Sequence, residues 1–336
     1  MITPGLFRRS LRAGGQWRVL LLWWASLLLP TLLAALPVLS SLGALLDYST
    51  RAKQVVAWLD GATLLELVKQ LGEPQAARVP TGYLSALLVL LAIAPAMAGA
   101  MVAAASSDEP LRFDQLLGGA GELFGRMVRL ALVAAFGLGI GGAIAAGAFK
   151  LASNAGEKAI SATQAERQLV AATAVSMIAL WLAQLTLEAG RAVFSAQPGR
   201  RSAFLAWWAG VRLIVRQPLR TLSVGLLGTL IGLGLAAVVM LARLRLEQSS
   251  AVRVVIAWAL AQTAAIAIGW GKATRLVGLA ELARADSADR SKRLAFQMSP
   301  PVTSPPPSAA EPPLVRSATQ DALASPVLSP PDRSDT

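Results

Sequence analysis

The side chains best placed to do chemistry form a short polar series, Gln184, Glu188 and Arg191, near the end of a long apolar stretch. On a helix, residues three or four positions apart lie on one face, so these three side chains would lie close together. A carboxylate there could couple ion movement or hold a lipid headgroup. We favour a simpler interpretation, a Glu188–Arg191 ion pair at the membrane interface, with the arginine drawn toward the headgroups.

Enzymatic chemistry has few other residues to use. The chain has neither histidine nor cysteine, which excludes imidazole or thiolate metal sites, cysteine nucleophiles and Ser-His-Asp triads. Motifs for phosphate loops, zinc proteases, calcium loops and hydrolase nucleophiles are absent as well. Glu188 and Asp114 are the only acids that a lipid-acting membrane enzyme could use. We therefore predict a non-enzymatic protein with no catalytic residue, no cofactor and no metal.

The composition predicts which elements carry these residues. The 336 residues are 55% hydrophobic and 15% charged, with a mean hydropathy of +0.56, against about 45–50% and about 25% in soluble domains. A membrane-spanning helix needs about 20 apolar residues, and strands with open edges cannot cross lipid. We therefore predict an all-α membrane protein whose residues 1–285 form a bundle of six transmembrane helices. The spans are residues 19–43, 81–105, 130–149, 168–188, 221–242 and 254–272.

The segments outside the spans have patterns of their own. Pro30 and Pro37 predict a kink in the first span or an early end near Pro37. The outside loop, residues 47–78, should contain short helices, one of them over residues 64–71 behind a capping box. That loop would form a sensing or substrate lid or, as we favour, an amphipathic hairpin on the bilayer. Residues 286–336 are rich in proline and should form a disordered cytoplasmic tail.

The basic residues predict the orientation. Alternate segments hold 21 Lys and Arg on one side of the membrane and 10 on the other, and the richer side faces the cytoplasm. Both termini should then be cytoplasmic. Arg outnumbers Lys 25 to 6, which we interpret as the codon usage of a GC-rich bacterium. The predicted location is therefore a bacterial inner membrane.

The net charge of +12 would suit nucleic acid in a hydrophilic chain. Here the basic residues cluster beside the ends of spans, where they meet anionic headgroups. We therefore expect membrane lipids as partners, and no nucleic acid. The predicted headgroup contacts are Arg200, Arg201, Arg212, Arg216 and Arg220.

Three segments that precede spans resemble one another, and we call them the lead-in segments. They comprise residues 6–18, 113–129 and 204–220, and each is basic and amphipathic. They predict interfacial helices and suggest three units, each with a lead-in helix, a span and a returning span. The alternative is that any cytoplasmic approach to a span has this composition.

Small residues recur inside the spans. Gly137 with Gly141, and Gly228 with Gly232, form GxxxG pairs that let helices approach closely. We interpret them mainly as contacts within the bundle, although such pairs also occur at faces between two copies of a chain. Ionisable residues are essentially absent at mid-depth, which argues against an ion-coupled transporter.

In layout, residues 1–285 resemble the YciC-type inner-membrane family and the membrane domains of glycerophosphodiesterases. The shared features are the basic lead-in segments and the outside insert after the first span. The resemblance implies no catalytic residues. It leaves three hypotheses, which are a protein that organises the bilayer or a membrane complex, a transporter or permease subunit, and a lipid-acting enzyme. We favour the first, with a membrane protein or a second copy of the chain as a further partner.

Overall fold

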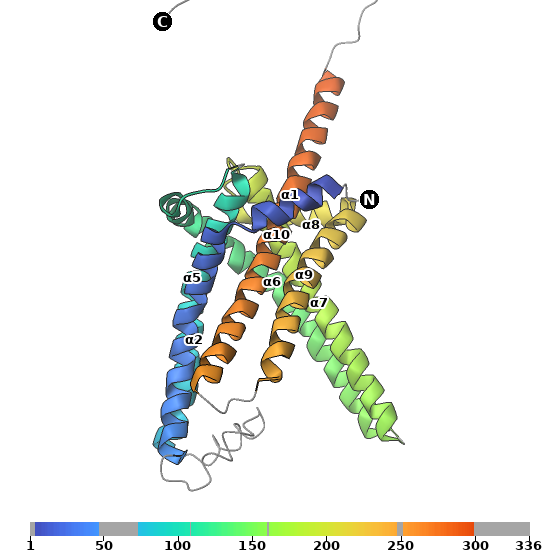
Figure 1. Ribbon diagram of the computed structural model, residues 1–336. Helices are drawn as coiled ribbons and strands as arrows, with labels where there is room; N and C mark the ends of the chain where they lie inside the picture. Colours follow the sequence, from blue (N-terminus) through green and yellow to red (C-terminus); the bar gives the residue numbers. More distant parts are fainter. Residues whose placement is uncertain (1–3, 47–72, 108, 160, 247–250, 299–336) are drawn as a thin grey trace, which may run out of the picture. The chain divides into compact units, whose positions relative to one another are not determined.

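A computed structural model of the chain describes residues 4–46, 73–107, 109–159, 161–246 and 251–298 (Figure 1). Within these residues every regular element is an α helix. Six of the helices are long and apolar enough to cross a membrane, namely α2, α5, α6, α7, α9 and α10. The predicted fold class is confirmed, since the chain is an all-helical membrane protein. The helices are α1 (Pro4–Gly14), α2 (Trp17–Leu46), α5 (Glu73–Ser106), α6 (Phe113–Glu157), α7 (Ala162–Ala196), α8 (Ala203–Arg216), α9 (Pro218–Leu244) and α10 (Ala251–Met298).

The two prolines in the first span do not end the helix. Helix α2 continues through Pro30 and Pro37 to Leu46, so the expected early end is wrong. Spanning helices tolerate proline where neighbouring helices accommodate it. Here the ring of Pro37 packs against Gly82 of α5, where an added methyl group would lie 2.5 Å from the proline Cγ. Because Gly82 has no side chain, α5 approaches α2 closely enough to pack against the proline ring.

Helix α5 begins at Glu73, inside the predicted outside loop. Pro74 fits there because backbone N–H groups in the first turn of a helix have no intrahelical partner. The remaining part of that loop, with the short helix predicted over residues 64–71, lies outside the described residues.

The predicted boundary of the disordered tail is wrong for residues 286–298. Helix α10 continues through them to Met298. Asp286 and Arg290, one helical turn apart, form an ion pair, which favours continued helix. Residues 299–336 lie outside the described residues. The chain divides into two compact units, residues 1–290 and 291–336, and the first contains the packed core.

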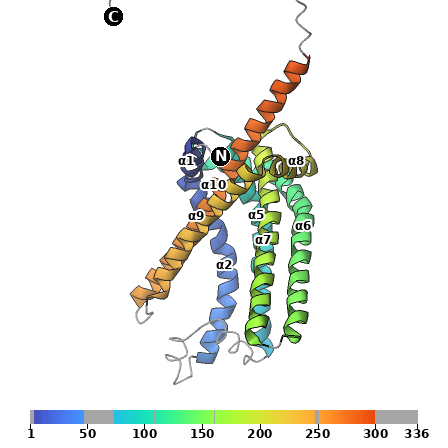
Figure 2. The ribbon, with the colours of Figure 1, turned by 90° about the vertical axis from the view of Figure 1, so that its right-hand side faces the viewer.

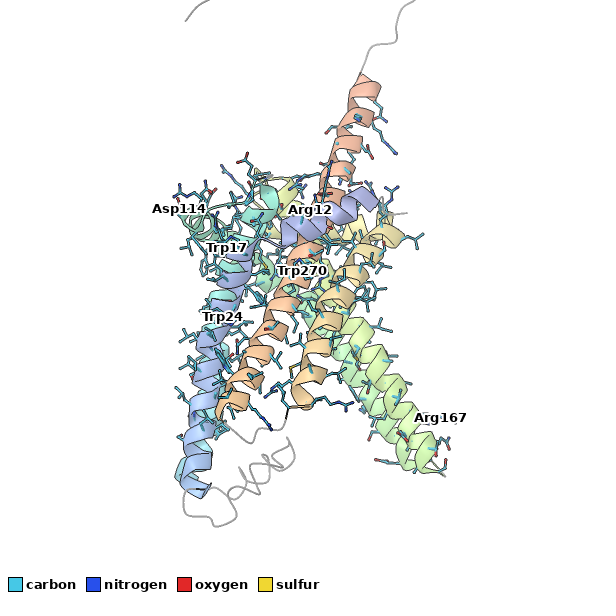
Figure 3. The ribbon with its side chains drawn as sticks, viewed as in Figure 1. Arg12, Trp17, Trp24, Asp114, Arg167 and Trp270 are labelled. Carbon is cyan, nitrogen blue, oxygen red and sulfur yellow. The ribbon has the colours of Figure 1, made fainter. Side chains whose placement is uncertain are left out.

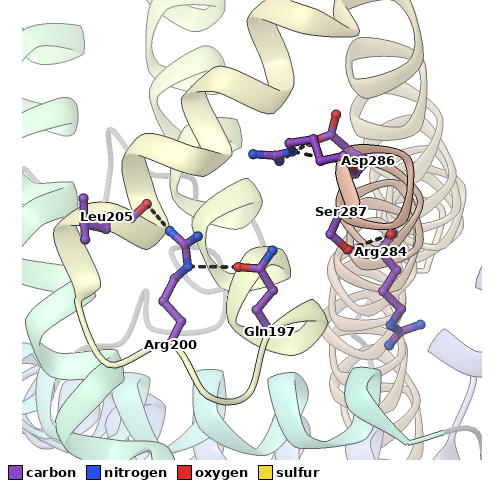
Figure 4. Close-up of polar contacts among 7 residues, drawn as sticks. Gln197, Arg200, Leu205, Arg284, Asp286 and Ser287 are labelled. Atoms are coloured by element: carbon purple, nitrogen blue, oxygen red, sulfur yellow. Dashed lines mark hydrogen bonds and ion pairs between the residues drawn. The ribbon is translucent and has the colours of Figure 1, made fainter. Parts of the chain in front are cut away.

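The lead-in segments are helical, but only two are separate helices. Helix α1 ends before Gly15, and α8 ends before Gln217. The second lead-in segment is the first part of α6 and continues without a break into its spanning part. Pro218 begins α9 and suits the first position of a helix. The turn that precedes α8 is held by Arg200, which donates to the side-chain oxygen of Gln197 at 3.0 Å and to the carbonyl of Leu205 at 2.9 Å (Figure 4).

The buried core lies at the end of the bundle that carries the lead-in helices. Helices α2 and α5 form one side-by-side pair and α6 and α7 another (Figures 1 and 2). Arg12, Trp17 and Asp114 lie at the lead-in end, and Arg167 lies at the opposite end of the α6–α7 pair (Figure 3). Toward that opposite end large apolar side chains such as Leu151 and Leu169 are 71% and 53% exposed, as expected for a surface that faces lipid.

The three lead-in segments pack in the same way on three helices that we call the return spans, α5, α7 and α10. A methyl group on Gly210 of α8 would lie 2.6 Å from the backbone nitrogen of Gly190 in α7. One on Gly14 of α1 would lie 2.7 Å from the nitrogen of Thr274 in α10, and one on Gly99 of α5 would lie 3.1 Å from the carbonyl oxygen of Ala120 in α6. Each lead-in helix thus crosses a return span at a small residue.

The register around these crossings repeats as well. The crossing positions are Gly14, Ala120 and Gly210 in the lead-in segments and Thr274, Gly99 and Gly190 in the return spans. Four residues before each lead-in crossing position lies a buried side chain. Three residues after each return-span crossing position lies a buried valine. The lead-in residues are Ser10, Leu116 and Ala206, and the valines are Val102, Val193 and Val277. Shared packing and register, in addition to composition, relate the three units.

Candidate functional site

Glu188 forms a buried ion pair with Arg275, between α7 and α10. The Nη2 atom of Arg275 lies 2.6 Å from Oε1 of Glu188, and the two side chains are 9% and 5% exposed. The Nη1 atom of Arg275 also donates to the hydroxyl of Thr229 in α9, at 2.6 Å. The same hydroxyl accepts from the indole nitrogen of Trp181 at 3.1 Å. The pair therefore joins three spanning helices through charge-assisted hydrogen bonds.

This pair departs from the sequence prediction in its partner. Glu188 pairs with Arg275 of α10, and not with Arg191 of its own helix. Both members are buried among neighbouring side chains. The sixth span was expected to end at residue 272, whereas α10 continues well beyond it.

Gln184, Glu188 and Arg191 line one cavity, together with Lys272. The cavity has a volume of about 280 Å³ and lies between α2, α5, α7 and α10. Apolar side chains, among them Met97, complete its wall. The structure thus places the three predicted polar residues around a common space and adds a lysine from α10.

The charges around this cavity do not balance. Glu188 is one anion among three cations, Arg191, Lys272 and Arg275, and its own charge is engaged by Arg275. Among the described residues, neither Arg191 nor Lys272 has an ion pair. Lys272 lies over the ring of Trp23, 4.6 Å from its centre, a contact that partly compensates a desolvated cation. The surroundings therefore carry an excess of two positive charges.

The return spans position these residues at equivalent points. The crossing residues of the return spans are Gly99, Gly190 and Thr274. The residues two positions before them are Met97, Glu188 and Lys272, and all three line the cavity. One residue after the crossing lie Ala100, Arg191 and Arg275. The site therefore lies where α5, α7 and α10 face one another, and its charges come from the second and third units.

Two further polar atoms in the cluster have no hydrogen-bond partner among the described residues. They are Oε2 of Glu188 and Nε of Arg275, and both are buried. Buried polar groups are ordinarily satisfied by protein or water. The site thus combines buried polar atoms that lack a hydrogen-bond partner with more positive than negative charges.

The four glycines of the GxxxG pairs lie at helix contacts within the chain. A methyl group on Gly141 would lie 3.2 Å from Cβ of Ala183 in α7, and one on Gly232 would lie 3.0 Å from Cα of Gly271 in α10. Gly228 lies against the side chain of Arg275, which needs that space to reach Glu188. Gly137 faces the ring of Trp207 at the distance of an ordinary van der Waals contact.

The predicted headgroup arginines differ in their surroundings. Arg200 is partly buried and bonded within its own turn. The others are exposed, and none has an ion pair with a described residue. These are Arg201, Arg212, Arg216 and Arg220. The exposed set surrounds α8 at the lead-in end.

The two acids considered for catalysis do not share a site. Asp114 is exposed in the first turn of α6, 3.7 Å from Arg112, and does not line the cavity that contains Glu188. Within the described residues no group of three or more acidic side chains could hold a metal ion.

Sequence reasoning missed Lys272, Arg275 and Trp23. A signal for the first two was present, since Ala-Gly-Arg at 189–191 and Ala-Thr-Arg at 273–275 share a pattern. Two polar residues of the sixth span have different kinds of partner. The side-chain oxygen of Gln262 accepts from the indole nitrogen of Trp24 in α2 at 2.9 Å, whereas the hydroxyl of Thr263 donates within α10, to the carbonyl of Ala259.

The fold and this cavity define an integral membrane protein with a charged cluster inside its helical bundle. Comparisons of the chain with models of known protein families, with curated proteins and with solved structures gave no match.

Proposed function

We propose that this chain is a non-enzymatic protein of the bacterial inner membrane, and that it organises the bilayer or a membrane complex through anionic lipids. The observation that supports the proposal is the exposed basic surface of α8, formed by Arg212 and Arg216 beside the start of α9. An amphipathic helix of this kind lies in the plane of the interface, where each cation gains about 1 kcal/mol from anionic headgroups.

A second cavity supports the same interpretation. It has a volume of about 460 Å³, and its wall contains Arg9 and Arg12 of α1 and Arg284 of α10. Arg284 also donates to the carbonyl of Ala105. Lead-in helix α1 thus carries two cations beside open space.

The orientation gives a direct prediction. A reporter fused after Thr336 should be active in the cytoplasm, because the positive-inside rule places both termini there. Paired reporters that respond in opposite compartments, such as a fluorescent protein and a phosphatase, would measure it. Phosphatase activity from the periplasm would contradict the proposed topology.

The lipid partner gives another prediction. When the full chain is extracted in native-lipid discs, mass spectrometry should find anionic phospholipid enriched over the surrounding membrane. Replacing Arg212 and Arg216 by glutamine should reduce the enrichment, by about fivefold in affinity for each arginine. The control is Lys150→Gln with Lys158→Gln, which removes the same charge from the opposite end of α6. If neither lipid nor protein co-purifies selectively, the organising role is unsupported.

A transporter or permease subunit is the second candidate. Its support is the buried Glu188–Arg275 pair beside a cavity, since ionisable residues within spans commonly mark substrate or ion pathways. The disc experiment separates the two functions, because a stoichiometric ATPase recovered with the chain would favour this candidate over the first.

A further inference from the structure

We propose that the cavity beside Glu188 is a specific site for one anionic phospholipid, with its phosphate on Arg191 and Lys272 and an acyl chain between α2 and α5. This inference rests on the proposed function and names its ligand. It differs from general headgroup attraction, because the site lies inside the bundle and not on the exposed surface of α8.

The first step is the charge. Glu188 is bonded to Arg275 at 2.6 Å. Its single negative charge therefore faces three cations, and neither Arg191 nor Lys272 has an ion pair of its own with a described residue. Unpaired charges are costly in a low-dielectric interior. An anion in the cavity would remove that cost, and phosphate oxygens suit the several donors of arginine and lysine. The cluster is therefore complementary to a phosphate group.

The second step is the shape of the surrounding space. A groove of about 750 Å³ runs between α2 and α5, and its wall includes Leu27 and Leu90, which also line the charged cavity. The two spaces are therefore adjacent. From Leu27 to Leu39 of α2 the groove extends for about 18 Å at 1.5 Å per residue. One leaflet of the hydrocarbon core is about 15 Å thick, so the groove suits one acyl chain.

The third step is the chemistry of the groove. Its wall is mainly apolar, and small side chains such as Ala34, Ala35 and Ala86 leave the space open. The cavity of about 280 Å³ is near the lower limit of ligand pockets. A headgroup therefore fits the cavity only if its chains stay outside it, in the groove. A soluble phosphate would leave the groove unused, so we assign the site to a phospholipid of the leaflet at the lead-in end.

The test uses the full-length protein in detergent and native mass spectrometry with added palmitoyl-oleoyl phosphatidylglycerol. We expect one tightly retained lipid, and a loss of affinity of about tenfold for each cation removed in Arg191→Gln with Lys272→Gln. The matched control, Arg212→Gln with Arg216→Gln, removes two exposed arginines and should change this single affinity by less than about twofold. Phosphatidylcholine with the same chains should bind at least about tenfold more weakly than phosphatidylglycerol.

A second pair of variants tests the groove without altering any charge. Ala34→Phe should fill the groove and weaken retention by about tenfold. Leu32→Phe introduces the same ring on a side chain that is 53% exposed and should leave retention unchanged. This pair decides the question if the charge variant fails to fold, as judged by gel filtration.

Several results would overturn the proposal. One is retention of phosphatidylglycerol that is unaffected by Arg191→Gln with Lys272→Gln, or by Ala34→Phe. Another is displacement of the lipid by millimolar glycerol phosphate, which would assign the cavity to a soluble anion. If Arg191→Gln with Lys272→Gln loses the single lipid but still enriches anionic phospholipid in native-lipid discs, the proposed function stands and the specific site lies in the cavity. Bulk enrichment that is absent throughout would instead contradict the proposed function.

Discussion

Glu188→Ala is expected to destabilise the protein by about 3–5 kcal/mol, the cost of breaking a buried ion pair from one side. The reason is the state of Arg275 after the substitution. Its side chain is 9% exposed, so the guanidinium would stay in the bundle without its carboxylate. Its remaining hydrogen bond, to Thr229, does not neutralise the charge. Thermal unfolding of the purified protein in discs of fixed lipid composition would measure the loss.

The double variant Glu188→Ala with Arg275→Met tests whether the loss of stability comes from the unpaired arginine. Removing both charges leaves neither member of the pair as a buried ion without its partner, and methionine fills much of the space of the arginine stem. We expect the double variant to regain most of the stability. Thr229 would still accept from Trp181, so few new polar groups would be left open. A loss below about 1 kcal/mol in Glu188→Ala, as at an exposed pair, would contradict the buried assignment.

The six spans could be predicted because lipid restricts the possible structures. A long apolar stretch in a membrane has to satisfy its backbone internally, and a helix does so without any tertiary partner. Length and hydropathy therefore located α2, α5, α6, α7, α9 and α10. The ends of the helices were less predictable. Nothing local to residues 286–298 ends α10, and the proline content that marks the tail begins only at Pro300.

The polar cluster could be predicted only in part, because its partners are distant in sequence. Gln184, Glu188 and Arg191 share a helix face by spacing alone. Arg275 lies 87 residues from Glu188, and no local pattern pairs them. The orientation rule also assigned Lys272 and Arg275 to a cytoplasmic segment, since it treats basic residues as flanking the membrane. The structure shows that helix α10 continues through them, with an acid on another helix bonded to Arg275.

The repeated units were visible as composition, but their packing was not. Three basic, amphipathic lead-in segments can be recognised in the sequence, while the choice of a return span for each is a property of the tertiary structure. Gly14, Ala120 and Gly210 are crossing positions because a neighbouring backbone lies against each of them. Other glycines of the same segments, such as Gly118, face open space, and the sequence does not distinguish the two kinds.

The crossing positions give the second large effect. Gly210→Ala should destabilise the protein by about 1–3 kcal/mol, the usual cost of overpacking. The new methyl group would lie 2.6 Å from the nitrogen of Gly190 and 2.7 Å from the carbonyl carbon of Ala189. Both are backbone atoms, so no side chain can move aside and α8 itself has to shift. Thermal unfolding in discs of fixed lipid composition would measure the loss.

Gly118→Ala is the matched control, since it lies in the second lead-in segment and an added methyl group would have nothing within 4 Å. Alanine favours a helix over glycine by about 1 kcal/mol, so this variant should be neutral or slightly more stable. Gly14→Ala, with a methyl group 2.7 Å from the nitrogen of Thr274, should behave like Gly210→Ala. Equal stability of all three variants would show that the lead-in helices are not held at these crossings. A loss confined to Gly14 and Gly210 would show that the repeated units share the packing that places Glu188, Arg191, Lys272 and Arg275 together.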